Sequence, residues 1–285
     1  MKKTILVAVL AIASLLTEAQ VQTPAPSPAG SVSTQVGLTD VKIDYSRPRA
    51  KGRTIFGTDA KAVVPYGKIW RTGANSGTKI TFSDDVTVEG IAVPKGEYLI
   101  FTWPGANEWT VSIYKDVKLG GDTEKYDKAN EAANFKVKAE KVTEKVDVLT
   151  FNITDIADDS KSANIQLVWE NTSIKFKIGV SYDEKVVKII DETIKSGKAQ
   201  PYDYFQSAVY YLETGRDLNK ALEWVNKAAE GMNSPFWVLY QKARIQKGLG
   251  DKAGAKTTAT ASIEGAKKAN NRDYQMMNDE LIKSL

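Results

Sequence analysis

The sequence predicts an α+β protein: an antiparallel β-sandwich or jelly roll over residues 31–180, followed by a short all-helical domain over residues 183–285. Up to about residue 180, apolar and polar residues alternate with a period of two, which is typical of strands with one buried face. From residue 183 onward the apolar residues recur at helical spacing, and one pattern of small residues repeats after 34 positions. These three observations indicate two domains in the chain of 285 residues.

The first 19 residues have the pattern of a secretory signal peptide. Lys2 and Lys3 precede a twelve-residue apolar run, and small residues allow cleavage before Gln20. The run is too short to span a bilayer comfortably, and no later stretch reaches that length, so we expect no membrane span after cleavage. Residues 20–30 are rich in proline and predict an extended tether. We therefore expect a periplasmic or secreted protein.

The alternating part predicts about ten short strands, separated by turns rich in Asp, Asn, Pro and Gly. The clearest strands cover residues 40–46, 79–82, 86–89, 98–103, 109–113, 135–139, 149–153, 165–169 and 174–178. Residues 123–133 are expected to form a short helix or a loop between two of these strands. Because amphipathic helices are missing between the strands, the pattern favours an antiparallel sandwich or jelly roll over a parallel sheet.

The helical part predicts six helices, of which the first ends at Gly197. The other five are expected over residues 202–214, 217–230, 235–248, 251–267 and 272–284. Asp217, Asp251 and Asp273 precede or begin helical runs and are the expected N-caps, because a side-chain oxygen there can accept from free backbone amides.

A repeat of 34 residues lies within this helical part. Small residues recur at matching offsets, as Ala221, Val225 and Ala228 and then as Ala255, Ala259 and Ser262. The period resembles that of the tetratricopeptide helical hairpin, in which small side chains let paired helices approach closely. We therefore expect a short helical array that offers a face to a protein partner, with a generic bundle of Ala-rich helices as the alternative.

The composition excludes several kinds of active site. The chain has no Cys and no His, so a Ser-His-Asp triad, a Cys nucleophile, a disulfide and a His-ligated metal are all excluded within one chain. Loss of the signal peptide takes the net charge from +4 to +3, too weak and dispersed to argue for nucleic acid. Acid pairs such as Asp158-Asp159 are interpreted as turn formers rather than calcium ligands. We predict no catalytic residue, no metal and no cofactor.

The densest chemical stretch covers residues 45–78, with four arginines among tyrosine, tryptophan and asparagine. Arginine forks bind carboxylate or phosphate at two points, and aromatic faces suit sugar rings. The predicted ligand-binding residues are Tyr45, Arg47, Arg53, Trp70, Arg71 and Asn75. Their ligand would be a glycan or another small polar molecule. The alternative is structural, with these side chains holding long loops onto the sandwich through bonds to backbone carbonyls.

The same stretch carries a resemblance to a known family. The runs YSRPRAKGRTIFG and VPYGKIWRTGAN, followed by VTVEGIAVPKGEYLIFTWPG and EWTVSIYKD, resemble the DUF2911 family over about residues 28–180. The resemblance implies an exported protein of the kind found largely in Bacteroidetes, with a β-rich domain of unknown function. The helical tail resembles the C-terminal extension of many members. One departure is visible: an acid often follows the Gly-Ala-Asn step in such proteins, whereas Ser76 follows Asn75 here.

Three functions follow from these observations. The favoured one is an exported, non-catalytic binding or envelope-associated protein, because the Arg/aromatic cluster stands beside no catalytic constellation. The second is a hydrolase acting on envelope carbohydrate or peptide, which requires a carboxylate such as Asp44 or Glu89 beside the cluster. In the third, the helical array alone holds a partner and the sandwich is a spacer.

Overall fold

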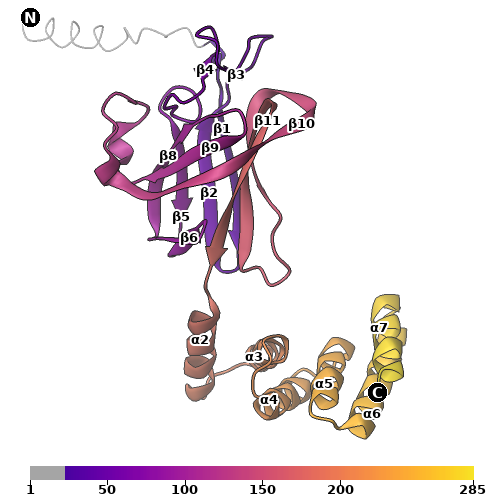
Figure 1. Cartoon of the computed structure of the whole chain (residues 1–285). Coiled ribbons are helices and arrows are strands. Elements are labelled where there is room, and N and C mark those ends of the chain that lie inside the picture. Colours follow the sequence, from indigo (N-terminus) through magenta and orange to yellow (C-terminus); the bar gives the residue numbers. More distant parts are fainter. Residues whose placement is uncertain (1–22) are drawn as a thin grey trace, which may run out of the picture. The chain divides into compact units, whose positions relative to one another are not determined.

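A computed structural model describes residues 23–285, so the predicted signal peptide and the first residues of the predicted tether lie outside the described part. The chain divides into two units, Met1–Tyr182 and Asp183–Leu285. The described part of the first unit contains the strands, and the second unit contains helices without strands, as Figure 1 shows. The predicted α+β class, with strands first and helices after, is confirmed.

Nine strands of the first unit form one sheet in the order β1-β2-β5-β8-β9-β10-β11-β6-β7. Every pairing in this sheet is antiparallel, whereas β3 and β4 form a separate short parallel pair. The strands are β1 (Ala29–Val36), β2 (Thr39–Ser46), β3 (Phe56–Gly57), β4 (Val64–Pro65), β5 (Thr78–Phe82), β6 (Val86–Val88), β7 (Ile91–Val93), β8 (Gly96–Trp103), β9 (Glu108–Tyr114), β10 (Glu131–Thr154) and β11 (Ser162–Val180). The antiparallel domain is as predicted. Its finer form, a sandwich or jelly roll, stays a prediction, because hydrogen bonds join all nine strands in one sheet.

The strands β10 and β11 are much longer than predicted, as their ribbons in Figure 1 show. Residues 135–139 and 149–153, expected as two strands, both lie within β10, and the two strands expected after residue 162 lie within β11. β10 pairs with β9 as far as Lys138 and with β11 from Ala139 onward, so that it serves two neighbours in turn. The alternation breaks a few residues further on, after Lys141, where the register with β11 shifts while the strand continues.

Two other stretches also differ from expectation. β1 begins at Ala29, so the last two residues of the predicted tether, 29 and 30, belong to a strand, and residues 23–28 precede it. Residues 123–133, expected as a short helix or a loop, contain the 3-10 helix η2 (Lys128–Asn130) and the first residues of β10. Another 3-10 turn, η1 (Val117–Leu119), precedes them.

A shared apolar core holds the sheet together. It takes side chains from strands far apart in the sheet order, including Ile43 of β2, Ile80 of β5, Val111 of β9 and Phe176 of β11, each at most 2% exposed. Burial of such side chains stabilises the fold by about 1.5–3 kcal/mol each. Since alternate residues of a strand face opposite sides, this core accounts for the period of two in the sequence.

Six helices make up the second unit, as predicted. They are α2 (Asp183–Lys195), α3 (Pro201–Glu213), α4 (Leu218–Gly231), α5 (Phe236–Gly248), α6 (Lys252–Lys268) and α7 (Arg272–Lys283). Asp217 and Asp251 cap α4 and α6, accepting hydrogen bonds from backbone amides of the first turn. The expectation for Asp273 is wrong. Asn271 caps α7 instead, accepting from the amide of Tyr274 at 3.1 Å, and Asp273 lies within the first turn, where a negative charge favours the helix dipole.

The 34-residue repeat is visible in the helix packing. The small residues at the repeated offsets of α4 and α6 are all fully buried. Gly231 and Gly265, also 34 positions apart, lie against the first residues of α3 and α5. A Cβ on Gly231 would come within 2.5 Å of Pro201, and one on Gly265 within 3.0 Å of Phe236. The helical extension therefore has the closely paired helices that the tetratricopeptide resemblance implies.

Candidate functional site

The two aromatic residues of the predicted site lie in the core. Tyr45, near the end of β2, is buried with its ring edge on Phe151, and its hydroxyl accepts from the Phe151 amide at 3.1 Å. Trp70 is 8% exposed and stacks on Trp169 with ring centroids 5.9 Å apart. Its indole N–H donates to the carbonyl of Gly73 at 3.0 Å. Neither ring is therefore free to stack on a sugar.

Arg47 attaches the end of β2 to the strand β10. Its Nε donates to the carbonyl of Leu149 at 3.4 Å, and its Nη2 donates to the hydroxyl of Thr150 at 3.2 Å. The backbone continues this attachment, since the Leu149 amide donates to the carbonyl of Pro48 at 3.0 Å. Arg47 is half-buried, and these bonds correspond to the structural alternative proposed for the cluster.

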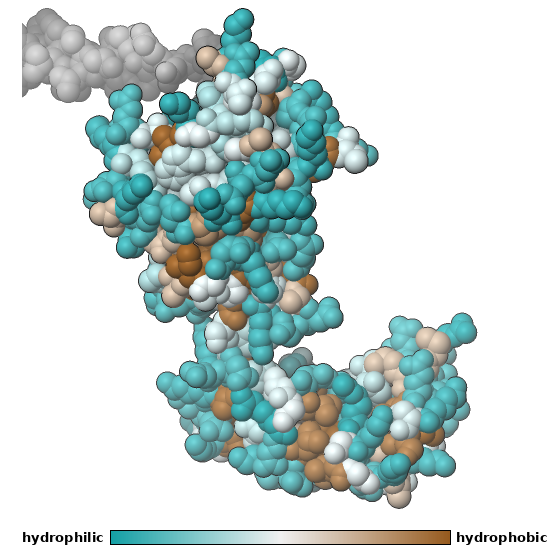
Figure 2. All heavy atoms as spheres, viewed as in Figure 1, coloured by the Kyte–Doolittle hydropathy of each residue, from teal (hydrophilic) through white to brown (hydrophobic). Residues whose placement is uncertain are grey.

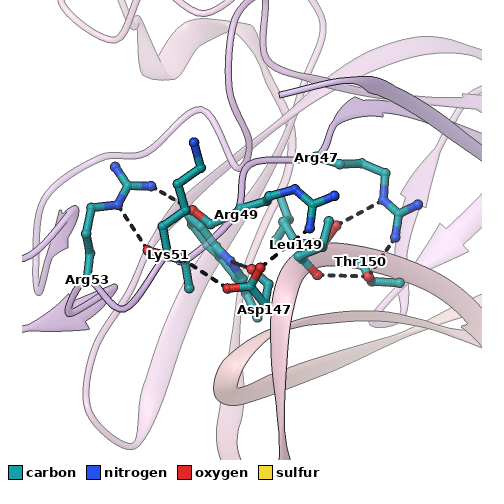
Figure 3. A network of polar contacts seen from close by, with 10 residues as sticks. Arg47, Arg49, Lys51, Arg53, Asp147, Leu149 and Thr150 are labelled. Carbon is teal, nitrogen blue, oxygen red and sulfur yellow. Dashed lines mark hydrogen bonds and ion pairs between the residues drawn. The ribbon is translucent and has the colours of Figure 1, made fainter. Parts of the chain in front are cut away.

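Asp147 of β10 contacts the next part of the loop, residues 49–51, as Figure 3 shows. Its carboxylate forms an ion pair with Arg49 at 3.6 Å and accepts from the Lys51 amide at 3.1 Å. Its backbone carbonyl accepts from the Ala50 amide at 2.6 Å. Figure 3 places Arg47 and Arg53 on opposite sides of Asp147, so the two arginines lie in different surroundings.

Arg71 and Asn75 hold a third, separate loop. The Nη1 of Arg71 donates to the carbonyl of Asn75 at 2.9 Å, and the amide of Asn75 donates to the hydroxyl of Ser46 at 3.0 Å. A Cβ on Gly121 would come within 2.7 Å of the Arg71 side chain, so a glycine is needed where the two loops meet. Within residues 23–285, no hydrogen bond or ion pair joins Arg71 or Asn75 to Arg53. The six predicted residues thus fall into several sets of contacts.

Arg53 differs from the other five because it lines a pocket. The chain turns at Lys51 and Gly52, whose φ angles are 50° and 72°, and the Arg53 amide donates to the carbonyl of Ala50 at 3.0 Å. Glycine adopts such a left-handed conformation without steric cost. The guanidinium then bonds back to the turn, from Nε to Ala50 O at 3.1 Å and from Nη2 to Arg49 O at 2.7 Å. These two bonds hold the side chain in place.

The pocket beside this turn, which we call the Arg53 pocket, has a volume of about 300 Å³. Its lining residues are Gly52, Arg53, Thr54, Ile55, Phe56, Lys141, Lys145, Glu170, Asn171 and Thr172. The first five belong to the loop that follows β2 and to β3, and the other five to β10 and β11. The site therefore forms only when the loop is seated on the two long strands.

A β-bulge shapes the far wall of the pocket. Lys141 pairs with Thr172 and Val146 pairs with Glu170, so residues 142–145 of β10 stand opposite Asn171 alone. Glu170 has a φ of 58°, a conformation that costs energy for a residue with a side chain, and its carboxylate forms an ion pair with Lys145. Bulges redirect side chains from their normal alternation, and they are frequent beside functional sites.

The lining of the Arg53 pocket is positively charged. Arg53, Lys141 and Lys145 bring three positive charges, and Glu170 brings one negative charge. Lys141 is exposed and forms no ion pair within residues 23–285, whereas Glu170 is held by Lys145 with only 19% of its side chain exposed. The backbone amides of Gly52, Thr54 and Ile55 donate to no other described residue. Three cations against one carboxylate make this lining suited to an anion.

Lys141, Lys145 and Glu170 were missed by the sequence analysis. The alternation predicts separate strands over residues 165–169 and 174–178, whereas Glu170 and Asn171 between them lie within β11. The available signal was the loss of alternation in KVTEK, residues 141–145, between two stretches with a clear period of two. A break in alternation without Pro or Gly is what a bulge produces.

The carboxylates required by the hydrolase hypothesis lie in other surroundings. Asp44 forms an ion pair with Lys42 at 2.9 Å on β2, and the carboxylate of Glu89 accepts from the Lys177 amide of β11 at 2.5 Å. Neither lines the Arg53 pocket, where Glu170 is the one carboxylate among the lining residues. Within residues 23–285, no group of three or more acidic residues is placed to hold a metal ion.

None of the helices in residues 23–285 combines the length and hydropathy that crossing a membrane requires.

Comparison with curated proteins and with solved structures gives no significant match. A family model described as "Protein of unknown function (DUF2911)" matches residues 27–178, which is more than half of the chain and includes β1 to β10 and most of β11. Both the loop that carries Arg53 and the bulged strands that face it lie inside the matched range, and the chain belongs to the DUF2911 family.

Proposed function

We propose that this chain is an exported, non-catalytic binding protein whose β domain holds a small anionic ligand in the Arg53 pocket. One observation carries the proposal. Three cations, of which Arg53 is fixed by bonds to its own turn, line a pocket together with a single carboxylate. A guanidinium held in place before binding loses little conformational freedom when a carboxylate or phosphate arrives.

The kind of ligand follows from what the pocket does and does not offer. A neutral glycan site needs exposed aromatic faces, but Trp70 and Tyr45 are buried, and Phe56 is the one aromatic residue among the lining residues. Charge is the dominant property of the remaining lining. We therefore place an anionic group, rather than a sugar ring, at the centre of recognition.

Isothermal titration of residues 20–285 with inorganic phosphate and with citrate tests this proposal. Arg53→Gln and Lys141→Gln are each expected to weaken binding about tenfold, since a hydrogen bond to a charged partner contributes roughly 1.5–3 kcal/mol. Lys61→Gln is the matched control, because Lys61 is exposed on another loop of the same unit. If neither anion binds, or if all three variants bind like the parent chain, the proposal is wrong.

The helical unit completes the proposal as a surface for a protein partner. Several large apolar side chains on its helices are exposed, including Tyr202 at 56%, Met276 at 50% and Trp237 at 37%. Figure 2 shows hydrophobic side chains gathered on the visible face of this unit. Exposed apolar groups of this size support a contact with another protein. Crosslinking of the intact chain, compared with Trp237→Ser and Met276→Ser, should show a loss of any partner that uses this surface.

A further inference from the structure

The charge of the Arg53 pocket points to a particular class of anion. The charged residues that line the pocket are Arg53 from the loop, Lys141 and Lys145 from β10, and Glu170 from β11. Three positive charges against one negative charge leave a net charge of +2. A ligand with one negative charge would leave this excess half compensated, whereas a dianion would balance it.

The number of hydrogen-bond donors among the lining residues points to the same class of anion. Arg53, Lys141 and Lys145 bring side-chain donors to the lining, and Gly52, Thr54 and Ile55, whose backbone amides donate to no acceptor within residues 23–285, line the same pocket. A carboxylate has two oxygens with which to accept these bonds. A phosphomonoester has three terminal oxygens and carries a charge of about −1.5 to −2 near pH 7.

Resting on the anion-binding function proposed above, we propose that the Arg53 pocket selects the dianion of a phosphomonoester over carboxylates and phosphodiesters. Recognition requires no reaction. The ligand exchanges water for the donors of the loop and the bulged strand, and its two charges meet the pocket's net charge of +2.

Because the chain has no histidine, a change in affinity between pH 5 and pH 7.5 can be attributed to ionisation of the ligand. The chain has no His, and carboxylic acids ordinarily titrate near pH 4 while Lys and Arg titrate above pH 10. Between pH 5 and pH 7.5 the main group that changes its charge is therefore the phosphomonoester, with a second pKa of about 6. Only about a tenth of it is dianionic at pH 5, so a pocket that binds the dianion should show an apparent affinity about tenfold weaker at pH 5 than at pH 7.5.

Calorimetric titration of residues 20–285 with three probes tests the inference: glycerol 3-phosphate, dimethyl phosphate and glycerate. We expect glycerol 3-phosphate to bind at least about fivefold more tightly than either monoanion at pH 7.5, and to lose affinity about tenfold at pH 5. Lys141→Gln, which removes one exposed charge, should reduce this preference, and Lys61→Gln should leave it unchanged.

The alternative outcomes are distinct. Equal affinity for the three probes, or an affinity for glycerol 3-phosphate that is the same at both pH values, overturns the dianion inference and leaves the anion-binding function standing. Failure of all three probes while phosphate or citrate still binds overturns the dianion inference alone, and failure of phosphate and citrate as well overturns both. The same phosphomonoester group occurs on soluble metabolites and on phosphatidic acid, so a parallel sedimentation assay with phosphatidylcholine vesicles, with and without phosphatidic acid, identifies the source once binding of the dianion is established.

Discussion

Replacement of Trp70 by alanine should destabilise the β unit strongly, because this residue forms part of the core. The indole stacks on Trp169 and lies 5.7 Å from Phe56 and 6.2 Å from Trp109, measured between ring centroids. Truncation of a buried Trp costs about 3–5 kcal/mol. The hydrogen bond to Gly73 accounts for about 1 kcal/mol of this, and the ring contacts for about 0.5–1.5 kcal/mol per pair.

Equilibrium urea unfolding of residues 20–285, followed by near-UV circular dichroism, measures this cost. Trp237→Ala is the matched control, since Trp237 is 37% exposed in the helical unit and should lose less than about 1 kcal/mol. Trp70→Phe keeps most of the ring and should fall between the two. A Trp70→Ala variant that keeps its stability but loses affinity for phosphate would refute the reasoning, because Trp70 would then be a ligand contact and not part of the core.

Two further predictions concern pH and helix packing. Hydrogen bonding from Asn164 and pairing with Lys175 lower the pKa of Asp155 to about 2, so its contribution to stability is present above pH 4 and is lost as the pH falls toward 2. The urea midpoint should therefore fall less steeply between pH 4.5 and pH 2.5 in Asp155→Asn, and identical slopes would contradict this. Ala259→Leu overfills the buried contact of the second repeat and should cost the helical unit about 1–3 kcal/mol by thermal unfolding, whereas Ala261→Leu, exposed on the same helix, should cost little.

The periodicity of the sequence predicted the strands and helices well, because burial on one face imposes it directly. It predicted the ends of strands less well. Residues 135–139 and 149–153 are separate runs in the sequence but belong to one strand, which changes partner from β9 to β11 at the end of the first run and bulges between the two runs. Alternation reports which face of a strand is buried, and it carries no information about which strand is the neighbour.

The helical repeat was predictable for a different reason. Helices that approach closely need small residues at fixed offsets, so Ala221 and Ala255 are visible in the sequence 34 positions apart. The cap of α7 was not predictable in the same way. Asn271 and Asp273 are both good capping residues, and only the backbone decides which of them stands one position before the helix.

The candidate site was predicted in part. Composition drew attention to residues 45–78, and their closeness in sequence suggested a single site. In the structure, Arg47 and Arg49 contact different residues of β10, and Trp70 packs into the core. The charged residues that line the pocket together with Arg53 come from a bulge far along the chain, where Lys145 and Glu170 pair across β10 and β11. Long-range pairing of this kind depends on the register of two strands, which a single sequence does not reveal.

A comparison of Arg47→Gln with Arg53→Gln tests the central claim most directly, with phosphate affinity and unfolding free energy measured on each variant. The claim is that Arg47 holds the loop on β10 and that Arg53 faces the ligand. Arg47→Gln should lower the unfolding free energy by about 1.5–3 kcal/mol and leave the affinity within about twofold, whereas Arg53→Gln should weaken the affinity about tenfold. Equal losses of affinity in the two variants would contradict the claim, because the arginines would then act as one site.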